Sequence, residues 1–182
     1  MGYIDVTDIR SCYPIAKITA ENLCHSYCME YGVPVKIARL AQTFGRGIKP
    51  NDNRIFVQFA NAVRTGSDIV LHTAGKSMGN YCDIDETVEA ILFLLQKGIN
   101  SEVYNVVNEE NTMQISEMAE LVAEKVAGGS IKVSYDIPEG NPFGYAPDTG
   151  LKLSGEKLRR LGWEAKCSLE DMYWKMLQDF KK

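Results

Sequence analysis

The sequence predicts an α/β fold in which helices and strands alternate for most of the length. The chain has 182 residues, the size of one domain or of one domain with part of a second. Segments with apolar residues at helical spacing alternate with short apolar runs typical of buried strands. The first half contains too few strands for a complete doubly wound sheet, so the predicted parallel sheet is a partial one.

Apolar periodicity, together with the Gly and Pro residues that end each segment, places the individual elements. The first helix, about residues 11–31, ends at Gly32, and Ser168 opens the last helix in a capping box with Asp171 in place of the usual Glu. The other expected elements are helices at about 54–64, 85–96 (capped by Asp85), 116–126 (capped by Ser116) and from Ser154, strands at 33–40, 69–72, 80–84, 102–107 and 131–135, and a long loop at 138–149.

Composition and charge exclude several classes of protein. A hydrophobic fraction of 45% with 24% charged residues is that of an ordinary globular protein. The net charge is 20 minus 24, or −4, and no block of Lys and Arg occurs, so we expect neither a nucleic-acid partner nor a membrane partner. No apolar stretch approaches a membrane span, the start lacks the pattern of a secretory signal, and the five cysteines lack framework spacing. These features favour reduced thiols and a cytoplasmic location.

Tyr13 and Lys17 form the most informative pair of side chains. On the first helix they stand four residues apart, so the phenol and the ammonium project from one face. An ammonium close to a phenol favours the phenolate and would lower the Tyr13 pKa from about 10 toward neutral pH. Tyr13 could then act as a general base or acid on a hydroxyl group. A Tyr and a Lys at this spacing also occur together by chance, so the surrounding sequence has to decide between the two interpretations.

That surrounding sequence resembles the extended short-chain dehydrogenase/reductase superfamily, specifically its NAD-dependent sugar-nucleotide epimerases and dehydratases. The Tyr-x-x-x-Lys motif at 13–17 is followed by a buried strand that ends in Arg39-Leu-Ala-Gln-Thr-Phe-Gly45, where the family has Arg-x-x-Asn-x-Tyr-Gly. Residues 80–90 are similar to the family's Asp-rich helix entry, and residues 157–163 and 168–171 to its C-terminal Leu-Gly-Trp signature. The resemblance covers nearly the whole chain, in the family's order.

The resemblance implies a role for several residues. Tyr13 would take the proton from a sugar hydroxyl while hydride passes to NAD, and Lys17 would assist Tyr13 and bind the nicotinamide ribose. Leu40 stands where the family makes a backbone contact to the nicotinamide end. Gln42, in place of the family's Asn, stands where a side-chain amide contacts the substrate diphosphate. Arg39 would be a local structural anchor.

Other features of the family are missing from this sequence. No Gly-rich turn between a first strand and helix is present, and neither is the Ser or Thr partner of the Tyr. We therefore expect residues 1–182 to be the C-terminal half of such an enzyme: part of a Rossmann-like parallel sheet with a small α/β substrate-binding subdomain. NAD would be bound mainly by the absent N-terminal, nucleotide-binding half, and the chain alone would be inactive. Gly79 replaces a family Arg that grips diphosphate, residues 143–147 lack a second one, and Lys76 or Lys152 could partly substitute.

The expected activity is epimerisation, dehydration or decarboxylation of a nucleotide-activated sugar, that is, an isomerase or lyase reaction. The alternative is a non-catalytic binding or oligomerisation module. No metal site is expected, because Cys24, Cys28 and the two histidines lack ligand spacing. The acidic residues at 83–89 are explained by a helix N-terminus. The isolated chain should expose an apolar surface around the first helix, and the family's habit of dimerising through this helix suggests a homodimer.

Overall fold

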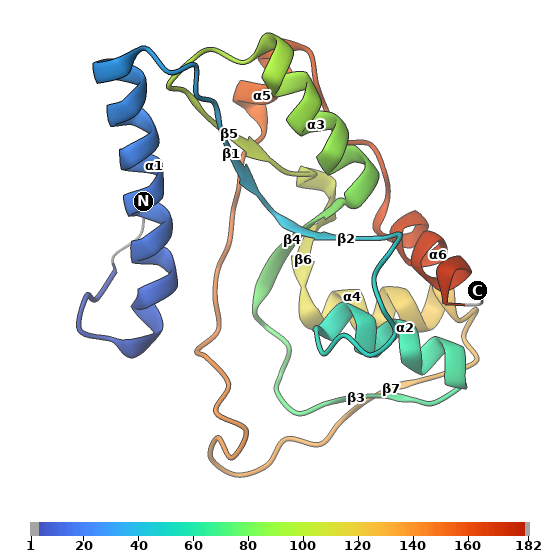
Figure 1. The fold of residues 1–182 in the computed structure, drawn as a ribbon. Coiled ribbons are helices and arrows are strands. Elements are labelled where there is room, and N and C mark those ends of the chain that lie inside the picture. The colour runs from blue at the N-terminus through green and yellow to red at the C-terminus, as the bar shows by residue number, and fades with distance from the viewer. Residues whose placement is uncertain (1–3, 181–182) are drawn as a thin grey trace.

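The computed structural model describes residues 4–180 and shows a mixed α/β fold (Figure 1). The α-helices are α1 (Cys12–Tyr31), α2 (Ile55–Thr65), α3 (Ile84–Lys97), α4 (Ile115–Leu121), α5 (Glu156–Leu161) and α6 (Leu169–Asp179). Short helical turns are η1 (Ile9–Ser11), η2 (Glu109–Asn111) and the π-helical η3 (Val122–Val126). The strands are β1 (Ile37–Leu40), β2 (Gln42–Phe44), β3 (Ile69–Leu71), β4 (Met78–Asp83), β5 (Val103–Val106), β6 (Thr112–Gln114) and β7 (Val133–Tyr135). No described helix is long and apolar enough to cross a membrane.

Parallel pairing dominates, which confirms the predicted fold class. β1 pairs with β5, β2 with β4 and β3 with β7, all in parallel, while β6 adds to β4 in the antiparallel sense. β1 and β2 are separated only by Ala41, yet they pair with different strands, since Leu40 faces Val106 and Gln42 faces Tyr81. The chain therefore changes sheets at Ala41.

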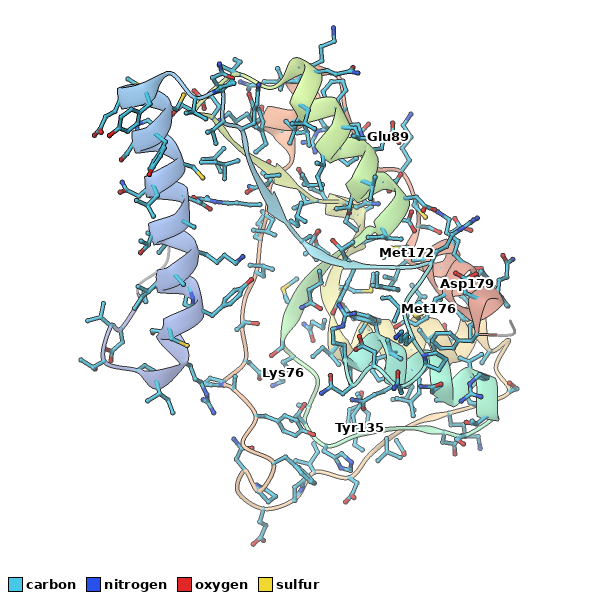
Figure 2. The ribbon with its side chains drawn as sticks, viewed as in Figure 1. Lys76, Glu89, Tyr135, Met172, Met176 and Asp179 are labelled. Atoms are coloured by element: carbon cyan, nitrogen blue, oxygen red, sulfur yellow. The ribbon has the colours of Figure 1, made fainter. Side chains whose placement is uncertain are left out.

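Two apolar clusters form the core. The larger one joins α2, α4, η3 and α6 to β2, β3 and β4, and Phe44 on β2 is completely buried in it, stacked on Phe56 with ring centroids 4.4 Å apart. Met172 and Met176 on α6 are fully buried in this cluster (Figure 2). The smaller cluster packs α3 and α5 on β5, with Leu94, Tyr104 and Trp163 among its buried members.

Helix α1 stands apart from this core (Figure 1). None of its 20 residues is buried. Apolar residues at helical spacing usually form a buried face, but on α1 two of them, Leu23 and Tyr27, are more than half exposed. The expected exposed apolar surface is thus present. The helix itself is well formed, and it ends where Gly32 adopts the left-handed conformation (φ 68°) and donates its N–H to the Cys28 carbonyl.

Several element boundaries differ from the sequence predictions. The cap of α3 is Asp83 rather than Asp85, because β4 ends at Asp83, one residue earlier than expected, and the Asp83 carboxylate accepts from the N–H groups of Asp85 and Glu86. The cap of α4 is Gln114 rather than Ser116, with Glu117 completing a capping box, so Ser116 lies inside the helix.

Strands formed by long-range pairing were the elements that the pattern missed. β2 and β6 have only three residues each and gain their structure from β4, which lies between them. The predicted strand at 33–40 starts its ladder only at Ile37, although the Val35 carbonyl before it already accepts the Ser101 N–H. The helix expected from Ser154 begins at Glu156, while the Ser168 cap is confirmed by a 3.1 Å bond from the Asp171 N–H to the Ser168 hydroxyl.

Candidate active site

Helix α1 holds Tyr13 and Lys17 in its first two turns. The turn η1 directly precedes the helix, and its cap residue Asp8 accepts the Arg10 N–H through its carboxylate at 2.8 Å. Pro14 is tolerated because the first turn of a helix needs no intrahelical N–H bond there. Tyr13 and Lys17 therefore lie one turn apart on the same face, as their spacing predicted.

The two side chains are close together in space. Lys17 Nζ lies over the Tyr13 ring, 5.5 Å from its centroid, which is a cation–π distance. Tyr13 is 69% exposed, so its phenol is open to a reactant that approaches α1. The phenol is thus accessible, and the ammonium lies against its ring.

Leu40 and Gln42 lie on either side of the point where the chain changes sheets. Leu40 is 48% exposed at the carboxyl end of β1, and Gln42 is exposed at the start of β2. The carboxyl ends of parallel strands are where α/β folds place their ligands. Within residues 4–180, neither Leu40 nor Gln42 forms a hydrogen bond or ion pair with Tyr13 or Lys17. The structure therefore brings Tyr13 and Lys17 together on α1 and leaves Leu40 and Gln42 on the neighbouring strands.

An ion pair between Arg39 and Glu21 connects the helix to these strands. Arg39 Nε donates to Glu21 Oε1 at 2.7 Å, and Arg39 Nη2 donates to Glu21 Oε2 at 2.5 Å, a bidentate geometry. The hydrogen bond from Arg39 lowers the pKa of Glu21, and the bond to Glu21 raises the pKa of Arg39. Arg39 is thus the anchor that the resemblance implied. Its partner Glu21 stands one helical turn beyond Lys17, and only the fold shows that Glu21 pairs with Arg39.

Gly79 stands where the resemblance implies an Arg that grips diphosphate. A Cβ atom at Gly79 would lie 2.6 Å from the Tyr81 hydroxyl, so the backbone has no room for a side chain there. Close to this glycine, a cavity of about 380 Å³ lies between β4, β6 and the segment 150–153, and Lys152 lines it together with Met78 and Thr112. Lys76 is exposed on the turn that precedes β4 (Figure 2).

The acidic residues at the start of α3 have structural partners. Asp83 is completely buried, caps α3 and pairs with Lys175, while Glu86 Oε1 accepts the backbone N–H groups of Lys166 and Cys167. The helix-terminus explanation of this cluster is therefore confirmed. All five cysteines are free thiols, and no group of three or more His, Cys, Asp or Glu in the described part of the chain could hold a metal ion.

Comparison with known proteins gives a consistent result. Residues 3–107 match the profile of the NAD dependent epimerase/dehydratase family. UDP-glucuronic acid decarboxylase 1 from Danio rerio is 29% identical over 181 residues, covering 100% of this chain but 42% of that protein. UDP-glucose 4-epimerase from Thermotoga maritima, solved with UDP-glucose, superimposes with a TM-score of 0.77 at 25% identity and covers 93% of this chain and 53% of that one.

A more distant structure shows the same fold over the whole chain. The dTDP-glucose 4,6-dehydratase from Bacillus anthracis, solved in complex with NAD, aligns over 100% of this chain and 56% of its own length, with a TM-score of 0.73 at 20% identity. The chain therefore spans about half the length of the relatives that it matches.

The parallel strands, together with the Tyr-x-x-x-Lys helix, define a Rossmann-like protein of the extended short-chain dehydrogenase/reductase class. More specifically, the chain belongs to the NAD dependent epimerase/dehydratase family, whose profile matches 105 of its 182 residues, that is, residues 3 to 107 inclusive.

Proposed function

We propose that this chain supplies the catalytic helix and the substrate-binding portion of an NAD-dependent enzyme that acts on a nucleotide-activated sugar. The observation that carries the proposal is the accessible Tyr13–Lys17 pair within the segment that matches the family profile. The relatives named above are an epimerase, a dehydratase and a decarboxylase of nucleotide sugars, which supports the substrate class.

In the proposed reaction, Tyr13 removes the proton from a sugar hydroxyl as the carbinol carbon becomes a ketone. NAD, when bound, accepts the hydride that leaves this carbon and returns it in a later step. Lys17 stabilises the Tyr13 phenolate and binds the nicotinamide ribose. Because Tyr13, Lys17 and Leu40 are all exposed, these residues fit a cofactor whose nicotinamide end approaches α1 and the end of β1. The Leu40 backbone would contact that end of the cofactor.

The substrate would bind on the other side of β1 and β2. We assign the Gln42 side-chain amide to the substrate diphosphate, beyond the carboxyl end of β1. The cavity near Gly79 is the second candidate contact region, because Lys152 lines it; Glu109, which also lines it, is paired with Arg159. A single ammonium gives one point of attraction instead of a planar, bidentate grip.

We further propose that a nucleotide-binding half, not contained in this sequence, completes the enzyme and binds most of NAD. A row of exposed apolar residues on α3 supports this: Val88, Ile91, Leu92 and Leu95, followed by Ile99, are 38–63% exposed. Among the described residues, β1 has a strand partner only on its β5 side. A half-sheet with flanking helices would cover the open β1 edge, the α3 row and the exposed side of α1 together.

Two experiments test the proposed function. The chain is first mixed with NAD, and its melting temperature is recorded; no shift is expected for the chain alone, while a submillimolar dissociation constant would contradict the assignment of NAD mainly to the other half. The chain is then fused behind a nucleotide-binding half of the family, and turnover of UDP-glucose, UDP-glucuronic acid and dTDP-glucose is measured. Tyr13→Phe should reduce turnover by about 10²–10⁴-fold, and near-normal turnover would refute the role of Tyr13.

A homodimer is the second part of this proposal, and it is also what one form of the non-catalytic alternative, an oligomerisation module, would form. The exposed stripe of small and apolar residues on α1, including Ala16, Ala20, Leu23 and Tyr27, supports association through this helix. Sedimentation equilibrium tests for a homodimer formed through α1, because replacement of Leu23 and Tyr27 by Lys should convert such a dimer to a monomer. A wild-type chain that is monomeric at all concentrations would contradict the homodimer.

A further inference from the structure

A charged row runs along the face of α1 that carries the candidate catalytic pair. Tyr13, Lys17 and Glu21 follow one another at intervals of four residues, so each lies about one turn from the next. A carboxylate one turn beyond a lysine can pair with that lysine on the surface of a helix. Glu21 is therefore a potential competitor of Tyr13 for the Lys17 ammonium.

The structure shows that Glu21 is already engaged from outside the helix. Both of its carboxylate oxygens accept hydrogen bonds from Arg39, at 2.7 and 2.5 Å, and its side chain is 23% exposed. Within residues 4–180, Lys17 forms no ion pair, and its ammonium lies over the Tyr13 ring instead. The titratable residues one turn beyond Glu21 on this helix are Cys24, a free thiol, and His25, which is hydrogen-bonded to Ser101.

We infer that Arg39 is a positioning residue that keeps the Lys17 ammonium available to Tyr13 by occupying Glu21. Arg39 precedes Leu40 at the end of β1, so the same ion pair also fixes the candidate catalytic helix relative to the strand end that would meet the nicotinamide. This inference rests on the proposed function for its catalytic meaning. Its physical content, a transfer of Glu21 from Arg39 to Lys17 when Arg39 is lost, can be tested without turnover.

The Arg39–Glu21 ion pair is one of the few side-chain interactions that hold α1 in place within the described chain. No residue of α1 is buried, so apolar packing contributes little to its position within the described chain. Among residues 4–180, the side-chain hydrogen bonds that join η1 and α1 to other parts of the chain are Arg39 to Glu21, Ser101 to His25 and Arg10 to the Gly144 carbonyl. The Arg39 pair is the bidentate one among them and the nearest in sequence to Lys17.

The first test is a carboxyl NMR titration of Glu21 in the 182-residue chain. We expect the Glu21 pKa to lie below its ordinary value in the wild type and to change little in Lys17→Gln, because Arg39 holds the carboxylate. In Arg39→Gln the pKa should rise, and adding Lys17→Gln to that variant should raise it again, since Lys17 has then become the partner. Circular dichroism checks that each variant is folded.

Two results would overturn the inference. One is a Glu21 pKa that responds to Lys17→Gln equally with and without Arg39, because the two cations would then act independently. The other is a Glu21 pKa that does not respond to Arg39→Gln. Arg39→Lys serves as a second variant that keeps the charge but loses the bidentate bond, and it should give an intermediate Glu21 pKa.

The second test measures turnover of the fused enzyme and distinguishes two roles of Arg39. In shielding, Arg39 keeps the Glu21 carboxylate away from Lys17; in anchoring, the ion pair only holds α1 against β1. Shielding predicts that Arg39→Gln is worse than Glu21→Gln by roughly two- to fivefold, the range that corresponds to an exposed ion pair. The double variant should recover to the level of Glu21→Gln, because the competing carboxylate is gone. Equal losses in both single variants and in the double variant would show that the pair is only an anchor. If the fused enzyme has no turnover at all, the proposed function fails while the titration still decides the pairing.

Discussion

The Lys175 ammonium donates a 2.9 Å hydrogen bond to Asp83 Oδ1, and this bond joins α6 to the start of α3. The Asp83 side chain is completely buried, whereas the Lys175 side chain keeps 27% of its exposure. The same Asp83 oxygen accepts the N–H groups of Asp85 and Glu86, so one carboxylate serves as helix cap and ion-pair partner. Partial burial lowers the pKa of Lys175, but its bond to Asp83 and the Asp83 charge outweigh this, and the net pKa is raised.

Removing the Lys175 ammonium should therefore be costly. Lys175→Met leaves a buried carboxylate without its cation, and we expect the free energy of unfolding to fall by about 2–4 kcal/mol. Urea unfolding followed by circular dichroism measures the change. Lys125→Met on η3 is the matched control, because Lys125 is exposed, and it should change the stability by less than about 0.5 kcal/mol. Equal effects of the two substitutions would contradict the importance of the Asp83 pair.

The pH dependence of stability should reveal the Glu109–Arg159 contact. Glu109 Oε1 accepts from Arg159 Nη1 at 2.6 Å and from the Gly155 N–H at 2.7 Å, and these bonds lower the pKa of Glu109. A carboxyl group with a lowered folded-state pKa stabilises the fold above its unfolded pKa, which is about 4.3. That contribution is lost as the pH falls through the folded-state pKa.

Glu109→Gln tests this expectation. The stability difference between the wild type and Glu109→Gln should be constant near neutral pH and should shrink as the pH falls below about 4. The neighbouring Glu110→Gln is the control, since Glu110 is exposed and only its backbone N–H takes part in the turn. Urea unfolding at pH 7, 5, 4 and 3 provides the curves, and a difference that grows on acidification would refute the assignment.

The sequence predicted the local parts of this structure better than the long-range parts. The helix with Tyr13 and Lys17 was predictable, because its spacing and the Gly32 end signal lie within one segment. The β2 strand was missed, since its three residues become a strand only by pairing with β4, which lies about 40 positions further along the chain. The Asp83 cap was missed for a similar reason, because β4 determines where α3 begins.

In the candidate site, too, the local features were predictable from the sequence, whereas the long-range contacts were visible only in the fold. Phe44, which stands where a Tyr is usual in the family, takes part in packing that only the fold shows. It is completely buried, stacks on Phe56 and meets Tyr173 edge-on with centroids 5.3 Å apart. The partner of Arg39 was visible in the sequence only as a charge of opposite sign on the same helix as Lys17.

Thiol reactivity should follow burial. Cys82 is completely buried, and burial raises its pKa to about 11, while Cys12 is exposed at the start of α1. Because the thiolate is the reactive form, iodoacetamide at pH 8 should label Cys12 rapidly and Cys82 only on unfolding. Mass spectrometry of timed samples measures both rates, and a sample in urea is the control in which the two rates should converge. Rapid labelling of Cys82 in the folded chain would show that β4 opens readily.

Substitutions at two adjacent leucines on α3 can distinguish the contribution of core packing from that of the proposed docking surface. Leu94 is 2% exposed in the smaller apolar cluster, whereas Leu95 is 63% exposed in the α3 row. Leu94→Ala should lower the free energy of unfolding of the chain by about 2–5 kcal/mol, because a cavity remains in the core. Leu95→Ala should change it by less than about 0.5 kcal/mol, yet it should weaken association with a separately expressed nucleotide-binding half. Titration calorimetry measures that association, and unchanged binding by Leu95→Ala and Leu95→Lys alike would exclude the α3 row from the interface.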